Sequence, residues 1–258
     1  MKIAILKLSG KAINDFVSNA EWLNVIAGIR ESYDGLLIVH GAGNQISEWS
    51  NSLGFEVSFI NGQRVTDESV VGVAAAVQSG LINSKLIAHL CSKGMNAVGL
   101  TGIDNNLFIA DYLDERLGYV GVPKQNLNLT WLKDLMKASI IPVFSSICRD
   151  AKGNLMNVNA DVFTNTLASS LQAETVFFIS DVSGVMLDGK TLRQIDEKAI
   201  QKGIRNKQIT GGMIPKLQSC VSLLNSGVQK IWIGNDLSNS FPYNLHHKHE
   251  GTWIVTAD

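Results

Sequence analysis

Three polar residues at alternate positions are the first candidates for chemistry. The segment LMNVNAD carries Asn157, Asn159 and Asp161, and an extended segment would point all three side chains to one side. The apolar run that follows predicts a helix over residues 160–171, and a carboxylate in the first turn of a helix is stabilised by the helix dipole. Because Asn and Asp are also common capping residues, a capped loop is the simpler explanation when the segment is taken alone.

Two lysines that are distant in sequence could make this segment the floor of a phosphoryl-transfer site. Lys7 stands near the end of the first predicted strand, just before Gly10, and Lys216 follows Gly212 in the first turn of a predicted helix. Glycines that begin helices let backbone N–H groups approach an anion closely. Two ammonium groups with Asp161 between them supply the charge that a transferring phosphoryl group requires.

The elements that would position these residues alternate between strand and helix. Apolar runs predict strands at residues 2–8, 35–40, 96–100, 108–112, 119–123, 140–145, 175–180, 230–234 and 252–256. Helical spacing and capping signals predict helices at residues 19–32, 45–53, 70–78, 81–93, 131–138, 160–171, 197–203 and 213–225. The first helix is expected to begin at a capping box of Ser18 and Glu21, and hairpin turns are expected at Asn61-Gly62 and at residues 150–154.

This alternation predicts the fold class. Strands that alternate with helices favour an α/β fold, a three-layer αβα sandwich with a central, mainly parallel sheet. In such sheets ligands bind beyond the carboxyl ends of the strands, which is where the glycine turns and Lys7 are expected to lie. If the chain forms two lobes, we expect both to share that one sheet.

One short pattern competes with this interpretation. Gly184, four further residues and then Lys190-Thr191 satisfy the P-loop pattern GxxxxGK[ST]. A true P-loop leaves a strand and opens a helix, whereas this segment predicts two short arms about a turn at Asp188-Gly189. We therefore expect a hairpin here and assign Lys190 no phosphate-binding role.

Composition narrows the class of protein further. The 258 residues suit one large α/β domain or two joined lobes, and 45% hydrophobic with 17% charged residues exclude a disordered chain. A formal net charge of -1 without a long basic run predicts neither a nucleic-acid partner nor binding to an anionic membrane. No apolar run approaches the roughly 20 residues of a membrane span, so we expect a soluble, cytoplasmic protein.

Cysteine and histidine give little support for a metal site. The three cysteines are widely spaced and form no CxxC pair, so we expect reduced thiols at Cys91, Cys148 and Cys220. Three of the five histidines fall in one short polar segment, as His246, His247 and His249. Such a segment is more often a solvated loop than a metal centre, and we expect no metal bound by protein ligands alone.

Six motifs, in order along the chain, resemble those of N-acetylglutamate kinases in the amino-acid kinase family. They are KLSG at residues 7–10, VHGAG at 39–43, NGQRVT at 61–66, GNLMNVNAD at 153–161, SDVSGV at 180–185 and GGMIPK at 211–216. The combination of MNVNAD, SDVSG and the lysine after GGMI is highly specific. The resemblance implies a lobe of residues 1–172 for acyl-amino-acid binding and dimerisation, and a lobe of residues 173–258 for ATP.

The resemblance also implies a reaction. The family uses ATP and Mg²⁺ to phosphorylate the side-chain carboxylate of an N-acylated glutamate, most directly N-acetyl-L-glutamate to its 5-phosphate in arginine biosynthesis. A glutamate carboxylate, with an ordinary pKa of about 4.3, is already ionised at neutral pH, so the nucleophile needs no general base. The difficulty is to bring two anions together, which calls for neutralisation and in-line positioning. Mg²⁺ would be held mostly by the phosphates.

Carried onto this chain, the family's motifs assign three sets of residues. Lys7 and Lys216 would stabilise the transferring group, Asp161 would hold both lysines, and the Gly10 and Gly43 amides would cradle it. The acyl-amino acid would be bound by Ala42, Gly43, Arg64, Asn157 and Asn159, with Arg64 as a fork on the α-carboxylate. ATP would be bound by Asp181, Val182, Ser183, Gly184, Val185, Met186, Gln208, Ile209 and Thr210.

Two departures from the family pattern leave questions open. Ser9 and Ala42 stand where most members have glycine, and either side chain could narrow the phosphate cradle. Arginine-inhibited members carry a helix before the first strand, and this chain begins at that strand, so we expect a homodimer without arginine feedback. The alternatives are a kinase of another acylated substrate, such as N-succinylglutamate, of another amino acid or of carbamate, and a non-catalytic sensor of ATP or an amino acid.

Overall fold

The computed structural model describes residues 1–126, 128–187, 189–237 and 251–256. The chain divides into two compact units. The N/C unit joins Met1–Leu36 to Leu171–Asp258, and the central unit comprises Leu37–Ser170. The first 36 residues therefore group with the C-terminal part of the chain, whereas the sequence-based boundary falls at residue 172. The functional roles predicted for the two lobes stay predictions.

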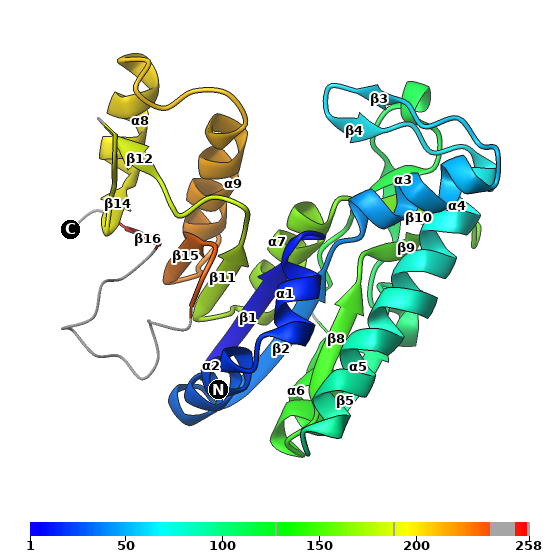
Figure 1. Cartoon of the computed structure of the whole chain (residues 1–258), viewed down its shortest axis with the longest axis horizontal. Helices are drawn as coiled ribbons and strands as arrows, with labels where there is room; N and C mark the ends of the chain where they lie inside the picture. The colour runs from blue at the N-terminus through cyan, green and yellow to red at the C-terminus, as the bar shows by residue number, and fades with distance from the viewer. Residues whose placement is uncertain (127, 188, 238–250, 257–258) are drawn as a thin grey trace. The chain divides into compact units, whose positions relative to one another are not determined.

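Parallel strands form the sheet of the N/C unit. β1 (Ile3–Leu8), β11 (Thr175–Ile179) and β15 (Lys230–Gly234) run side by side and parallel (Figure 1). Every residue of β1 and β11 is buried, as expected of parallel strands covered on both faces. β16 (Thr252–Val255) pairs antiparallel with β15, and β14 (Gln194–Asp196), which the sequence did not predict, pairs parallel with β16.

Four helices and a hairpin complete the described part of the N/C unit. They are α1 (Ala12–Ser18), α2 (Glu21–Ser32), α8 (Glu197–Arg205), α9 (Met213–Asn225) and the pair β12 (Met186–Leu187) and β13 (Lys190–Thr191). α9 contacts β15 and β16. The hairpin confirms that the P-loop pattern is accidental, since Lys190 lies on an exposed antiparallel arm and not at a helix start. Asp188 of the predicted turn lies outside the described residues.

The predicted capping box of α2 is wrong. Ser18 ends α1, a helix that the sequence analysis did not predict, and its hydroxyl donates to the Asn14 carbonyl 2.9 Å away. Asn19 takes the capping role, because its side-chain oxygen accepts the Glu21 N–H at 3.0 Å. Ser, Asn and Asp near a helix start all qualify as caps by type, so only the backbone geometry selects among them.

The central unit contains two sheets and a hairpin. Its parallel sheet has the order β2 (Gly35–His40), β8 (Ile141–Ser145), β5 (Ala97–Leu100). A second sheet has the order β6 (Ala110–Tyr112), β7 (Val120–Pro123), β10 (Leu155–Val158), β9 (Ile147–Arg149). The predicted hairpin is formed by β3 (Phe59–Ile60) and β4 (Gln63–Arg64), with Asn61 and Gly62 both at positive φ, as a type I′ turn requires.

Most helices of the central unit begin and end within two residues of the bounds predicted from the sequence. They are α3 (Gly43–Ser52), α4 (Glu68–Ala75), α5 (Asn83–Ser92), α6 (Thr130–Lys137) and α7 (Ala160–Leu171), with short 3₁₀ turns η2 (Asp104–Asn106) and η3 (Glu115–Leu117). α5 contacts β5 and β8, and α6 contacts β8. Both units carry parallel strands with helices, so the predicted α/β class with a mainly parallel sheet is confirmed.

The two helices predicted over residues 70–78 and 81–93 are in fact one. α4 and α5 are joined by the π-helical segment η1 (Ala76–Ile82), which contains Gly80, so this glycine does not end the helix. By length and composition alone the 25-residue helix Glu68–Ser92 could cross a membrane, but half of its most apolar window is buried inside the structure, as in the core helix of a globular protein. Its polar residues Gln78 and Asn83 are buried and hydrogen-bonded.

The cysteines behave as the sequence predicts. Cys148 and Cys220 are buried, Cys91 is exposed, and all three are free thiols. Burial raises the pKa of Cys148 to about 12, so its thiol stays protonated at neutral pH. A protonated, buried thiol is chemically inert, and we assign Cys148 to packing.

Candidate active site

The carboxyl ends of β1 and β11 lie next to each other in the N/C unit. The two strands pair in parallel with Leu8 opposite Ile179, and the Ser9 N–H donates to the Ile179 carbonyl at 3.1 Å. The turn after β1 and the residues after β11 therefore emerge at one edge of the sheet. This is the edge at which ligands of parallel sheets bind.

Lys7 and Lys216 lie on one face of this sheet. Lys7 pairs in register with Phe178, and in-register residues of neighbouring strands point to the same face. The Lys216 Nζ lies 5.9 Å from the centroid of the Phe178 ring, although Lys216 comes from the first turn of α9. Lys7 is only 8% exposed, and lysine is rarely buried to this degree. Phe178 thus neighbours both predicted lysines, Lys7 as its partner on β1 and Lys216 through its ammonium group.

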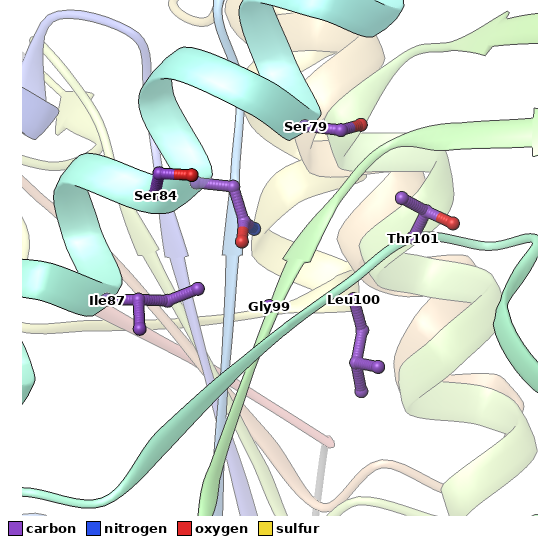
Figure 2. A pocket seen from close by; sticks show the side chains of 7 residues that line it. Ser79, Ser84, Ile87, Gly99, Leu100 and Thr101 are labelled. Atoms are coloured by element: carbon purple, nitrogen blue, oxygen red, sulfur yellow. The ribbon is translucent and has the colours of Figure 1, made fainter.

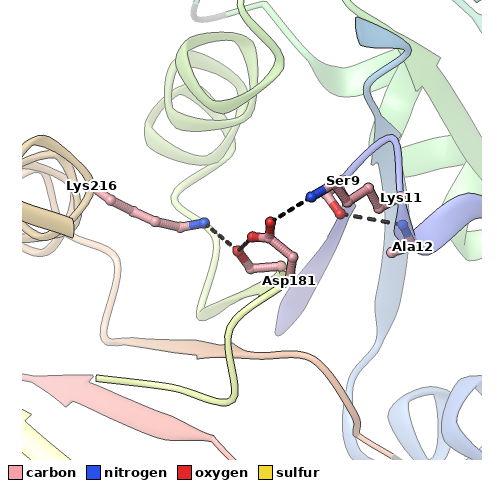
Figure 3. Close-up of polar contacts among 6 residues, drawn as sticks. Ser9, Lys11, Ala12, Asp181 and Lys216 are labelled. Atoms are coloured by element: carbon pink, nitrogen blue, oxygen red, sulfur yellow. Dashed lines mark hydrogen bonds and ion pairs between the residues drawn. The ribbon is translucent and has the colours of Figure 1, made fainter. Parts of the chain in front are cut away.

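A short chain of polar contacts runs along the same strand ends (Figure 3). Lys216 donates to the Ser180 hydroxyl at 3.1 Å, Ser180 donates to the Asp181 carboxylate at 3.3 Å, and Lys11 donates to the other Asp181 oxygen at 3.0 Å. The hydrogen bond from Lys11 is the main reason that the pKa of Asp181 is lowered. Sequence reasoning missed Lys11, whose only signal was a charged residue directly after Gly10.

The first segment predicted to bind ATP packs closely against the side chains of Thr191 and Thr252. Gly184 has φ +136, and a Cβ there would lie 2.6 Å from the Thr252 Oγ1 and 2.7 Å from the Thr191 Cγ2. The Val185 N–H donates to the same Thr252 hydroxyl at 2.8 Å. In the second predicted ATP segment Ile209 is buried, whereas Gln208 and Thr210 are exposed. The structure thus places both segments in the N/C unit, with Lys7, Gly10 and Lys216.

The substitutions at Ser9 and Ala42 have structural explanations. The Ser9 side-chain oxygen accepts the Ala12 N–H at 3.3 Å, which orders the start of α1 (Figure 3). Ala42 is 3% exposed, so its methyl group is covered by protein. A Cβ added to Gly43 would meet nothing within 4 Å, so Gly43 borders open space in the central unit. The extra methyl of Ala42 therefore sits inside the fold.

In the central unit, the Arg64 Nη2 makes hydrogen bonds within the protein, whereas its Nη1 makes none. Its Nη2 donates to the Gly43 carbonyl at 2.7 Å and to the Ser47 hydroxyl at 2.8 Å, and its guanidinium lies 4.9 Å from the centre of the Phe59 ring. Its Nη1 is buried and has no hydrogen-bond partner. Burial lowers the pKa of Arg64 from its ordinary value, but arginine remains a cation at neutral pH. A fixed, buried cation with a spare donor suits a carboxylate ligand.

Asn157 belongs to a directed chain of hydrogen bonds in the central unit. The Ser146 hydroxyl donates to Gln78 at 3.0 Å, the Gln78 amide donates to Asn157 at 3.2 Å, and the Asn157 amide donates to the Thr66 hydroxyl at 3.3 Å. Thr66 then donates to the Arg64 carbonyl at 3.1 Å. The chain orients Asn157 and ties it to the strand that carries Arg64. Sequence reasoning missed Gln78, a polar residue within an apolar helix.

In the LMNVNAD segment, Asn159 caps the helix α7 and Asp161 lies in its first turn. The Asn159 side-chain oxygen accepts the N–H groups of Asp161 at 2.8 Å and of Val162 at 3.4 Å, so Asn159 caps α7. The simple capping explanation therefore holds for Asn159, and its predicted part in substrate binding stays a prediction. Asp161 lies in the first turn of α7, as predicted. Asp161 and both lysines belong to different units, and their predicted contact stays a prediction.

His40 is buried and neutral. Asn83 donates to the Val143 carbonyl at 2.8 Å through the same amide nitrogen that lies 3.1 Å from the His40 Nε2. His40 Nε2 is therefore an acceptor, and its Nδ1 proton faces the Gly41 carbonyl 3.3 Å away. Burial lowers the pKa of His40 from 6.5 to about 4. His40 thus fixes the first residue of the Gly41 to Gly43 turn.

A separate pocket opens beside β5 in the central unit. It has a volume of about 280 Å³ and is lined by Ser79, Asn83, Ser84, Ile87, Gly99, Leu100 and Thr101 (Figure 2). None of the residues predicted to be catalytic or to bind the acyl-amino acid or ATP lines it. Among the described residues no group of three or more His, Cys, Asp or Glu side chains could hold a metal ion, and His246, His247 and His249 lie outside those residues.

The sequence matches the profile of the amino acid kinase family over residues 2–235. The chain belongs to this family. It is 35% identical to the acetylglutamate kinase of Bacillus subtilis (strain 168) over 257 residues. These residues make up 99% of this chain and 97% of that protein. It is 32% identical over 238 residues to the acetylglutamate kinase of Endomicrobium trichonymphae, at 92% and 94% coverage. Among solved structures, smu.665 from Streptococcus mutans UA159 has a TM-score of 0.79 and 30% identity over 99% of each chain.

Proposed function

We propose that this protein is an acetylglutamate kinase, which transfers the γ-phosphoryl group of ATP to the side-chain carboxylate of N-acetyl-L-glutamate. The observation that carries the proposal is the match to the acetylglutamate kinase of Bacillus subtilis, at 35% identity over 99% of the chain. The product is N-acetyl-L-glutamate 5-phosphate, and the reaction belongs to arginine biosynthesis. The family membership supports a kinase of this fold.

The two lysines are proposed to stabilise the transferring phosphoryl group. Lys7 is the strand partner of Phe178 and the Lys216 ammonium group lies near the Phe178 ring, which supports the proposal that the two lysines act together. Lys7 and Lys216 would neutralise the equatorial oxygens, where charge accumulates as the bond to ADP breaks. The backbone amides of Gly10 and Gly43 would add hydrogen bonds. Asp161 would orient both lysines, as in the family pattern.

Arg64 and Asn157 are proposed to bind the acyl-amino acid. The partnerless Nη1 of Arg64 supports hydrogen bonding to the α-carboxylate, while the Nη2, which donates to Gly43 and Ser47, holds the guanidinium in place. Asn157 would contact the amide of the acyl group, and the hydrogen-bond chain through Gln78 and Thr66 supports a fixed orientation. Ala42, Gly43 and Asn159 complete the proposed set by resemblance.

ATP is proposed to bind at two segments of the N/C unit, Asp181 to Met186 and Gln208 to Thr210. Mg²⁺ would be held mostly by the phosphates, since the described residues offer no cluster of three acidic or histidine side chains. It would bridge phosphate oxygens and offset their charge while the carboxylate approaches. We also propose that the protein is cytoplasmic and forms a homodimer. Light scattering on the purified protein would test the homodimer.

Two alternatives deserve a direct test. One is a kinase for another acyl group, such as N-succinylglutamate, or for another amino acid or carbamate. The other is a non-catalytic sensor, which the joint presence of Lys7, Asp161 and Lys216 disfavours, because a sensor does not need two cations on a transferring group.

The test is ADP release with ATP, Mg²⁺ and a panel of acceptors. The panel contains N-acetyl-L-glutamate, N-succinyl-L-glutamate, free glutamate and carbamate. We expect the largest kcat/KM with N-acetyl-L-glutamate. Faster turnover with another member would reassign the substrate, and ATP binding without turnover on any member would establish the sensor.

A further inference from the structure

Lys11 is a third lysine at the carboxyl ends of β1 and β11. It follows Gly10 directly, and its Nζ lies 3.0 Å from a carboxylate oxygen of Asp181, the first residue of the segment proposed to bind ATP (Figure 3). Both residues belong to the N/C unit. A nucleotide seated on Asp181 to Met186 therefore comes within reach of the Lys11 ammonium group.

The contact between Lys11 and Asp181 contributes little to folding. The side chains are 66% and 58% exposed, and exposed ion pairs of this kind are weak and screened by salt. Such a pair separates easily when a stronger anion arrives. Folding stability alone therefore gives no reason for a cation at this position.

Charge balance gives that reason. Asp181 places a negative charge in a segment proposed to receive a polyphosphate, which like-charge repulsion would oppose. Lys11 binds one oxygen of Asp181, and Lys216 reaches the other through the Ser180 hydroxyl. The four residues carry one net positive charge. Without Lys11 the cluster would be neutral, and its attraction for phosphate would fall.

We propose that Lys11 is a nucleotide-binding residue that leaves Asp181 and donates directly to the β- and γ-phosphate oxygens of ATP. This inference rests on the proposed ATP site and adds a residue to it. Asp181 holds the Lys11 ammonium at the strand ends until the nucleotide binds. The β- and γ-phosphates are the ones concerned, because Lys11 adjoins Gly10 and the proposed γ-phosphoryl cradle.

The experiment measures nucleotide affinity by calorimetry with Mg²⁺ and without any acyl-amino acid. Lys11→Met should weaken ATP and ADP about tenfold, the low end for a charge-assisted hydrogen bond at an exposed site, and should change AMP affinity less than twofold. Lys11→Arg should recover most of the loss. Lys190→Met removes another exposed lysine, from β13, and should change no affinity more than twofold.

Three results would overturn the proposal. The first is ATP affinity in Lys11→Met within twofold of the wild type. The second is an equal loss for AMP, which would indicate a structural defect. The third is recovery of wild-type affinity when Asp181→Asn is added to Lys11→Met, which would mean that Lys11 acts only by neutralising Asp181. A wild-type protein that binds no nucleotide would refute the proposed function as well, whereas the other outcomes leave that function intact.

Discussion

At the scale of single residues, Lys216 carries the most specific catalytic assignment. Its ammonium group donates to Ser180 and lies over the ring of Phe178, the strand partner of Lys7. A group that acts on the transferring phosphoryl group is strongest in the transition state, so Lys216→Ala should lower kcat by 10²-fold or more. The KM for the acyl-amino acid should stay within about threefold. Steady-state kinetics measures both constants, and an unchanged kcat would remove Lys216 from the mechanism.

Arg64 gives the corresponding prediction for substrate binding. Lysine cannot reproduce a planar guanidinium whose Nη2 is held by Gly43 and Ser47 and whose Nη1 is proposed to meet the substrate carboxylate. Arg64→Lys should therefore raise the KM for N-acetyl-L-glutamate about 10- to 100-fold, with a smaller effect on the KM for ATP. Arg116→Lys, at an exposed arginine, is the control. Equal changes in both KM values would point to general damage and contradict the assignment.

At the scale of elements, Gln78 links the π-helical segment η1 of the helix Glu68–Ser92 to Asn157, which is proposed to bind the substrate. Gln78→Leu would leave polar groups of Asn157 and Ser146 without partners in a buried place, at a cost of about 1–3 kcal/mol. We expect lower stability in urea and a raised KM for the acyl-amino acid, because Asn157 loses its orientation. Gln229→Leu changes an exposed glutamine and should alter neither. Wild-type KM in Gln78→Leu would break the proposed link.

Local patterns predicted the elements far better than the contacts between them. The buried runs of β1, β2 and β11 and the Asn61-Gly62 hairpin are properties of short segments, and the structure confirms them. The strand β14 depends on pairing with β16, which is distant in sequence, whereas the cap at Asn19 and the join across Gly80 depend on backbone geometry that residue types alone do not specify. The same limit applies to the site. Lys7 and Lys216 were found through motifs, whereas the partners Lys11 and Gln78 appear only when strands and helices are assembled.

At the scale of the whole molecule, burial of His40 predicts how stability changes with pH. The pKa of His40 is lowered from 6.5 in the unfolded chain to about 4 in the folded one, so the unfolded chain binds the proton first as the pH falls. The stability that depends on neutral His40 is intact above pH 6.5 and is lost as the pH falls toward 4. The total loss is on the order of 3 kcal/mol.

Urea unfolding at pH 7 and at pH 4.5 measures this effect. The difference in unfolding free energy between the two pH values should shrink by about 2 kcal/mol in His40→Gln, which cannot titrate in this range. His89→Gln removes a histidine that is less buried and should shrink it much less. An undiminished pH dependence in His40→Gln would show that other groups control acid unfolding.

The assignment of the whole protein depends on the covalent product. Purified protein, ATP, Mg²⁺ and N-acetyl-L-glutamate should yield an acyl phosphate that hydroxylamine traps as a hydroxamate, in amounts equal to the ADP formed. Lys216→Ala should form neither at a comparable rate. ADP without hydroxamate, or hydroxamate only with a different acceptor, would contradict the proposal that this chain phosphorylates the side-chain carboxylate of N-acetyl-L-glutamate.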